Sequence, residues 1–337
     1  RYADAVGGAA RVDRVMPVLI EDNVGENGSD RITLMYATSS FAPAPAILSA
    51  LVDETKDLNV RNAPDDGLGA SAVFAINDLV LIGLPQAITT GSLDNTCTLL
   101  RITGIPTPSG TDTTLPRDIA TSARIPVRKD GSEAPNTLTK TDSASYTYDA
   151  ATSAPSIVAK VGSTATPFVR NHYSISNLSE LQVRNLTANA PAVSIGDGVV
   201  DMQAQYGVVA ATCADNAGTC NVVNTWTNAT VNASGAATGD WVAPTPANMA
   251  RIKALRVSVV TRSSQRERDP ATLNCLPFDG TTNVPTSAAP CRAWANDANA
   301  PTLPWTGTSD WTANGRFFRY RVYETIIPLR NMLWGNT

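Results

Sequence analysis

Histidine is nearly absent from this sequence, and the motifs of the common enzyme classes are missing. His172 is the only histidine among 337 residues, so a Ser-His-Asp or Cys-His site would have to use it. The surrounding stretch, VRNHYSIS, alternates so that His172 falls on the polar face of a predicted strand. The sequence contains no G-x-S-x-G, no P-loop and no glycine-rich dinucleotide motif. We therefore expect neither enzyme activity nor a cofactor.

Charge and long apolar runs are also scarce. Charged residues make up 17% of the chain, below the usual quarter, and the formal net charge is −4. Without a basic run, this composition argues against a nucleic-acid partner. The longest apolar runs, residues 73–76 and 79–84, are far shorter than the ~20 residues that span a bilayer. Ala, Thr, Ser, Asn, Gly and Pro take the place of charge, which is typical of a secreted or surface-exposed protein rich in loops.

The five cysteines indicate an oxidising compartment. Cys213 and Cys220 enclose the small loop ADNAGT, and Cys275 and Cys291 bracket a longer loop rich in Pro and Thr. Because free thiols would have no packing role in such surface loops, we expect each pair to form a disulfide. A metal site is disfavoured, because there is no C-x-x-C and only one histidine. Cys97 is left over, either as a buried free thiol or as half of a bridge whose partner is missing from this chain.

Strand patterns dominate the chain. They cover residues 31–39, 71–84, 96–105, 166–176, 180–186, 254–263 and the C-terminal stretch 316–337. Helical signals are few: residues 42–54 predict a short helix, and residues 196–208 fit a helix or a strand equally well. We expect the last two strands to form one apolar sheet face that covers the core or meets a partner. Its residues are Leu255, Val257, Val259, Phe318, Tyr320, Val322 and Ile326.

We expect a single β-rich domain over residues 1–337. Two stretches with little hydrophobic pattern, 107–165 and 263–315, predict loop insertions, and the second contains three tryptophans. The polar loop EDNVGENGSD (21–30) carries oxygen ligands that could hold Ca²⁺, but it lacks EF-hand spacing, and a hydrophilic turn is the plainer interpretation.

Tryptophans and acids in predicted loops suggest carbohydrate binding as a second functional class. Trp226 and Trp241 bracket an Asn/Thr/Gly linker and could form a sugar-binding platform, although tryptophans more often cap a core or an interface. Acid pairs such as Asp197 with Asp201 occur at spacings that chance alone produces. A secreted carbohydrate-binding or carbohydrate-active β-protein is therefore the alternative function, and a generic bacterial surface adhesin domain is a third.

Three segments together resemble the W-class minor pilins (PilW) of bacterial type IV pili. They are GDGVVDMQAQYGV, then IKALRVSVVTRS, then the closing RYRVYETIIPLRNML. The early stretch over residues 8–39 also fits, as a small-polar loop that leads into a first strand. The closing strand is the most specific of these segments, and residues 107–165 lie outside the resemblance.

The resemblance implies a pilin-like α+β fold, in which an N-terminal helix packs on an antiparallel sheet. The leader and hydrophobic helix of the family are absent from this sequence, which starts at Arg1, so we expect a processed or truncated chain whose sheet face is left uncovered. A family cysteine just after that helix would be the partner of Cys97. We would then expect poor solubility, self-association or the need for a partner, because large exposed apolar patches are typical of interaction sites.

The resemblance also implies a function. It is that of a structural, non-enzymatic subunit of a tip complex that primes pilus assembly and supports adhesion or twitching motility. The implied partners are other minor pilins, the major pilin and a tip adhesin. The implied location is the pilus on the bacterial cell surface, reached through the inner membrane and periplasm, with membrane contact only through the missing helix.

Overall fold

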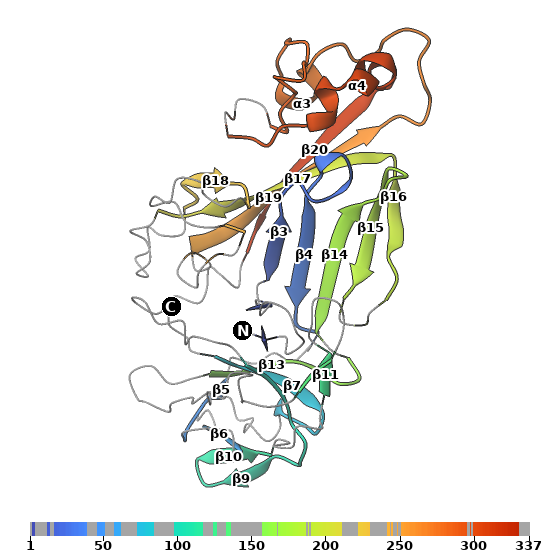
Figure 1. Cartoon of the computed structure of the whole chain (residues 1–337). Helices are drawn as coiled ribbons and strands as arrows, with labels where there is room; N and C mark the ends of the chain where they lie inside the picture. Colours follow the sequence, from blue (N-terminus) through green and yellow to red (C-terminus); the bar gives the residue numbers. More distant parts are fainter. Residues whose placement is uncertain are drawn as a thin grey trace. The chain divides into compact units, whose positions relative to one another are not determined.

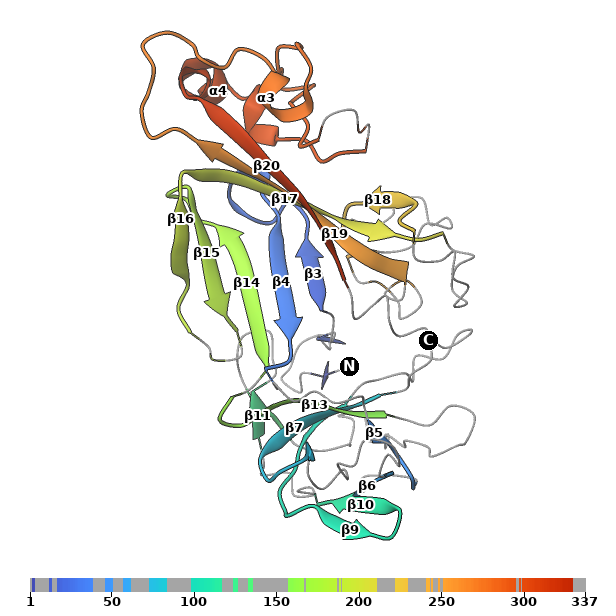
Figure 2. The same ribbon diagram turned by 180° about the vertical axis from the view of Figure 1, so that it is seen from behind.

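The structure is a computed structural model of the chain, and Figures 1 and 2 show it from opposite sides. It describes residues 2–3, 12–13, 17–38, 46–50, 57–61, 73–83, 98–116, 124–126, 133–135, 157–166, 168–186, 188, 190–210, 222–229, 241–242, 244, 248, 251–294, 297 and 299–329. Where the sequence predicted one domain, the chain forms two compact units. The first is Arg1–Pro17, Leu34–Asn171 and Asn185–Ala190, and the second is Val18–Thr33, His172–Arg184 and Pro191–Thr337.

The first unit consists of antiparallel strands around its own core. One sheet has the order β5-β13-β7-β8, formed by β5 (Ala46–Ile47), β13 (Ile157–Ser163), β7 (Asp78–Gly83) and β8 (Thr98–Arg101). Another has the order β6-β10-β9, formed by β6 (Leu58–Arg61), β10 (Asp112–Leu115) and β9 (Thr107–Ser109). Two strand pairs are β1 (Tyr2–Ala3) with β2 (Val12–Asp13) and β11 (Arg124–Pro126) with β12 (Glu133–Pro135).

Two stretches of this unit differ from the sequence-based expectation. Leu115 and Val158 are fully buried in its core, so the stretch 107–165 supplies core strands rather than only a loop insertion. Residues 46–47 form strand β5, although the sequence predicted a short helix over 42–54.

The second unit holds the four-stranded sheet and the larger part of a five-stranded one. The five-stranded order is β16 (Val193–Asp197), β15 (Glu180–Asn185), β14 (Val169–Ile175), β4 (Arg31–Tyr36) and β3 (Val18–Glu21). The four-stranded order is β18 (Thr225–Thr227), β17 (Val199–Val208), β19 (Ile252–Arg262) and β20 (Tyr320–Pro328). β17, β19 and β20 run side by side in both views (Figures 1 and 2). The short helices are η1 (Glu26–Gly28), α3 (Leu276–Asp279), η4 (Pro304–Gly307), α4 (Ser309–Ala313) and η5 (Gly315–Phe317).

Residues 196–208, whose pattern fitted a helix or a strand equally well, contain the strand β17. All ten of its residues are buried. A strand buried on both faces loses the simple alternation of apolar and polar residues, because both sets of side chains must pack. This burial explains why the sequence pattern did not distinguish a strand from a helix.

The register of β19 and β20 divides the predicted apolar face between two faces. Leu255 lies opposite Ile327, whereas Val260 lies opposite Val322. Because directly opposed residues share a face, Val322 lies on the face away from Leu255. The prediction that Leu255, Val257 and Val259 share one face with Tyr320, Val322 and Ile326 is therefore wrong. Alternation shows which residues of one strand share a face, but it does not fix the pairing with the next strand.

We call one face of this sheet the tyrosine face, after Tyr206, and the other the disulfide face, because Cys275 and Cys291 pack in one cluster with its Val260. The tyrosine face carries Met202, Ala204, Tyr206, Leu255, Val257, Val259, Tyr323 and Ile327. The disulfide face carries Asp201, Gln203, Gln205, Arg256, Ser258, Val260, Tyr320, Val322, Glu324 and Ile326. On the tyrosine face, Leu255 and Val257 are buried and Val259 is half-buried. On the disulfide face, Tyr320 and Val322 are half-buried. Ile326 was predicted to be buried, but it is 55% exposed. Phe318, just before β20, is half-buried.

Other segments of the same unit pack against part of each face. Cys291, Trp294 and Leu303, all from the predicted insertion 263–315, pack in one cluster with Val260 on the disulfide face. On the tyrosine face, the Tyr206 ring lies 6.3 Å from the Trp241 ring and its hydroxyl accepts a hydrogen bond from the Ile20 amide. The inference of an uncovered apolar face is therefore wrong for Leu255 and Val257, which are buried, whereas Tyr323 and Ile327 of β20 stay exposed.

The predicted fold class also needs correction. The described chain consists of antiparallel sheets, and no helix that is described in full exceeds five residues. It is therefore a predominantly β fold and not an α+β pilin with a helix packed on its sheet. A search of the described residues found no helix of the length and apolarity needed to cross a membrane.

Candidate interaction surface

A buried carboxylate links the four-stranded sheet to the segment that covers its disulfide face. Asp201 is fully buried, and its Oδ2 accepts a hydrogen bond from the indole N–H of Trp305 at 2.8 Å. Its Oδ1 accepts from the Gln203 amide at 2.9 Å. Burial raises the pKa of Asp201 from 3.8 to about 6, although both hydrogen bonds act to lower it.

A second buried carboxylate occupies the edge of β17. The Oδ2 of Asp30 accepts from the Ala204 amide at 2.7 Å, and the Asp30 amide donates to the Met202 carbonyl at 2.7 Å. Its Oδ1 accepts from the Asn23 amide at 2.9 Å. Burial raises the pKa of Asp30 well above its usual range. The loop 21–30 thus hydrogen-bonds to the backbone of β17. The described part of the chain contains no group of three or more metal-ligating side chains.

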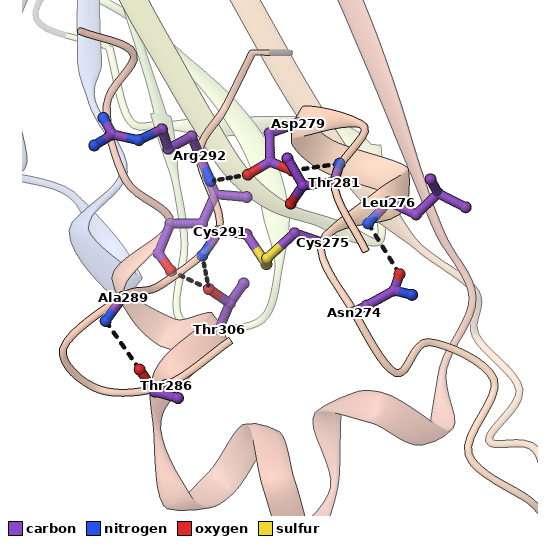
Figure 3. Close-up of a disulfide and its surroundings, with 11 residues drawn as sticks. Asn274, Cys275, Leu276, Asp279, Thr281, Thr286, Ala289, Cys291, Arg292 and Thr306 are labelled. Atoms are coloured by element: carbon purple, nitrogen blue, oxygen red, sulfur yellow. Dashed lines mark hydrogen bonds between the residues drawn. A yellow bond between two sulfur atoms is a disulfide. The ribbon is translucent and has the colours of Figure 1, made fainter. Parts of the chain in front are cut away.

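The segment 263–315 is held together by a disulfide and an aromatic cluster. Cys275 and Cys291 form the predicted bridge, which closes a sequence separation of 16 (Figure 3). Beside it, Asp279 accepts from the Arg292 amide and the Thr306 hydroxyl accepts from the Cys291 amide (Figure 3). The nearby aromatic rings, 5.4–6.2 Å apart between centroids, are Phe278, Trp305, Trp311 and Tyr320. The second predicted pair, Cys213 with Cys220, lies outside the described residues, as does Cys97.

Arg256 joins the same segment to the outer strand. Its guanidinium bonds Asp297 at 3.1 Å and Glu324 of β20 at 2.8 Å. It also lies 4.4 Å from the centre of the Trp294 ring. These partners come from two stretches of sequence, both far from Arg256, so the alternation pattern gave no signal for them.

β20 offers the largest exposed apolar side chains of this sheet. Tyr323, Ile326 and Ile327 are 52%, 55% and 42% exposed. Just before and at its start, Arg319 and Arg321 are exposed as well. An exposed strand with aromatic, aliphatic and arginine side chains has the composition of a protein interface.

The comparisons with known proteins give the family. The model of the family described as Type IV Pilus-assembly protein W matches residues 163–331, which is half of the chain. The chain belongs to this family. No curated protein and no solved structure matches it.

Membership in the PilW family associates the chain with the type IV pilus system and its assembly. The matched region contains β17, β19 and β20, which carry the three segments on which the resemblance was based. It also contains the disulfide Cys275–Cys291 and the buried carboxylate of Asp201. The surface formed by β20 is therefore part of the region that defines the family.

Residues considered for chemistry or sugar binding in this PilW chain lie apart or are packed. His172 is half-buried, and its Nδ1 lies 3.1 Å from the Thr33 hydroxyl. Asp197 is exposed on β16, whereas Asp201 is buried in β17. Trp241 is buried and Trp226 is half-buried, so these two do not form an exposed platform.

Proposed function

We propose that this PilW-family chain is a minor pilin that acts without catalysis in a tip complex that primes type IV pilus assembly. The family match over residues 163–331 carries this proposal. Its partners are other minor pilins, the major pilin and a tip adhesin, and it supports adhesion or twitching motility. Its place is the pilus on the bacterial cell surface.

The described side chains are consistent with a structural subunit. The buried polar groups of the four-stranded sheet, Asp201 and Asp30 among them, accept hydrogen bonds that fasten chain segments to one another. The disulfide Cys275–Cys291 suits a protein that works in an oxidising compartment. The secreted carbohydrate-binding alternative relied on tryptophans and acids in loops, and the described tryptophans are buried or half-buried.

Deletion of the gene, followed by complementation, tests the proposal. We expect the deletion to abolish or sharply reduce surface pili and twitching, and the full-length gene to restore both. The variant His172→Ala should restore piliation as well as the wild type, because this residue has no catalytic role in the proposal. A deletion strain with normal pili would contradict the proposed function.

A further inference from the structure

β20 has one unpaired edge. It is the last strand in the order β18-β17-β19-β20 and pairs with β19 alone among the described residues. Nine residues, Tyr320–Pro328, form this strand. An unpaired edge of this length presents a row of free N–H and C=O groups that can hydrogen-bond to another chain.

The hydrogen bonds at the two ends show which residues face outward. The Arg319 carbonyl accepts from Ser263 at 2.8 Å, and the Leu329 amide donates to Lys253 at 2.9 Å. Backbone direction alternates along a strand, so odd-numbered residues between them bond toward β19. The even-numbered residues direct their backbone groups to the free edge; they are Tyr320, Val322, Glu324, Ile326 and Pro328. Pro328, which has no N–H, belongs to the outward set and costs β19 no hydrogen bond.

Large apolar side chains flank this edge. Tyr323 and Ile327 are exposed on the tyrosine face, and Ile326 is exposed on the disulfide face. Three large exposed apolar side chains within five residues are an aggregation hazard on an open edge unless a partner covers them. An incoming strand would bury them on both faces of the extended sheet.

Exposed positive charge gathers at the N-terminal end of β20. Arg321 lies 5.7 Å from the Tyr323 ring, and Arg266 lies 4.0 Å from the Phe317 ring. Neither guanidinium has an ion pair within the part of the chain that the structure describes. Arg319 pairs with Glu267 at 2.9 Å, but its side chain is 74% exposed, and such surface pairs contribute little. This cluster is conspicuous in a chain of net charge −4, and its chemistry suits carboxylates.

We infer that the free edge of β20 receives an extended strand from another pilus subunit, which places carboxylates against Arg319 and Arg321 and apolar side chains against Tyr323 and Ile327. This inference rests on the proposed function, because it assumes a partner from the pilus. Main-chain hydrogen bonds supply affinity in this mode of recognition, and the flanking side chains supply specificity.

A second copy of this chain is a poor occupant of the edge. Antiparallel pairing of β20 with itself about its centre would place Glu324 opposite Glu324 of the copy. It would also place Arg321 opposite Ile327 rather than opposite an acid. Like charges in direct opposition destabilise a strand pair, so the geometry favours a different chain with acidic residues.

Binding measurements on the purified 337-residue chain test the edge directly. The probes are the soluble domains of the other minor pilins of the same pilus system, each titrated by biolayer interferometry. Ile326→Pro removes one outward N–H without removing a hydrogen bond to β19, and Ile326→Ala keeps that N–H while removing the same apolar side chain. We expect the proline variant to bind roughly tenfold or more weakly than the alanine variant. The melting temperatures of both should stay close to that of the wild type.

A charge test keeps the inference falsifiable if the proline variant misfolds. The double variant Arg319→Glu/Arg321→Glu should weaken binding by roughly tenfold or more at low salt, with a smaller loss at high salt. Arg268→Glu, an exposed arginine outside β20, is the matched control and should bind nearly as well as the wild type.

The outcomes separate this inference from the proposed function. Equal affinities for Ile326→Pro and Ile326→Ala in folded proteins would overturn the strand-addition geometry, and an unaffected double arginine variant would overturn the charge match. A wild-type chain that binds none of the minor pilins would overturn the inference as a whole. The proposed function is tested independently, by whether the deletion strain still carries pili.

Discussion

The Trp305 indole N–H donates a 2.8 Å hydrogen bond to the Asp201 carboxylate, across 104 residues of sequence. This bond joins the covering segment to the central strand of its sheet. Trp305→Phe would leave a buried carboxylate oxygen without its donor, which costs about 1–3 kcal/mol of unfolding free energy. Urea denaturation followed by circular dichroism measures the loss.

Trp294→Phe is the matched control for that experiment. The Trp294 side chain is equally part of the covering segment, but its indole nitrogen is buried and has no hydrogen-bond partner among the residues that the structure describes. Its replacement should therefore cost packing and part of the ring contact with Arg256, but no hydrogen bond, and less than Trp305→Phe. An equal loss in the two variants would show that the hydrogen bond to Asp201 contributes nothing specific.

The pH dependence of stability follows from the same carboxylate. Because burial raises the pKa of Asp201 from 3.8 to about 6, the folded state keeps a proton that the unfolded state has already lost. Stability should therefore fall as pH rises from about 4 to about 6, by up to ~3 kcal/mol from this group. Asp30, whose pKa is also raised by burial, adds a contribution of the same sign.

Asp201→Asn isolates that contribution. The amide cannot ionise. A turn of the Gln203 side chain would let its Oε1, which has no partner among the described residues, accept from the new amide, but it would give up the bond from Nε2 to the Gly28 carbonyl. We expect melting temperatures measured from pH 4 to pH 7 to decline less steeply in the variant than in the wild type. Superimposable pH profiles would show that Asp201 does not titrate in this range.

Burial predicts unequal effects for a cross-strand pair on the tyrosine face. Leu255 is buried and Ile327, directly opposite, is 42% exposed. Leu255→Ala should cost about 2–5 kcal/mol because it leaves a cavity, whereas Ile327→Ala should cost less than about 1.5 kcal/mol. Thermal and urea unfolding of the two variants checks this order, and a reversed order would contradict the burial of Leu255 and the exposure of Ile327.

The disulfide should contribute measurably to stability. Cys275 and Cys291 are both buried and close a loop with a separation of 16 residues, for which chain entropy predicts about 3 kcal/mol. The variant Cys275→Ala/Cys291→Ala should lose about this much in urea denaturation. Reduction should destabilise the wild type more than the variant. Mass spectrometry of unreduced peptides will also test the Cys213–Cys220 bridge, which remains a prediction.

Local sequence signals located the last two strands of the chain but not their pairing. Alternation predicted strands over 254–263 and at the C-terminus, and the structure has β19 (Ile252–Arg262) and β20 (Tyr320–Pro328) there. It did not predict that Leu255 faces away from Val322, because register depends on the partner strand. The predicted α+β class was inferred from the resemblance, and the described sheets are covered by loop segments instead.

The polar contacts around the four-stranded sheet could not be predicted from the sequence, for a different reason. Asp30 and Ala204 are 174 residues apart, and Arg256 finds its acids at Asp297 and Glu324. Such pairs leave no periodic trace, since each residue alone resembles an ordinary loop or strand residue. The Cys275–Cys291 bridge was predictable because both cysteines flank one loop.

The position of the protein on the pilus tests the central claim most directly. The turn between β9 and β10 suits an epitope tag, because Ser109 and Thr111 are exposed and the Gly110 backbone has open space around it. Immunogold electron microscopy of pili from cells that produce the full-length tagged protein then locates it. A tip-complex subunit predicts label at one end of the filament, and label spread evenly along the shaft, or absent from pili that carry the major pilin, would contradict the account.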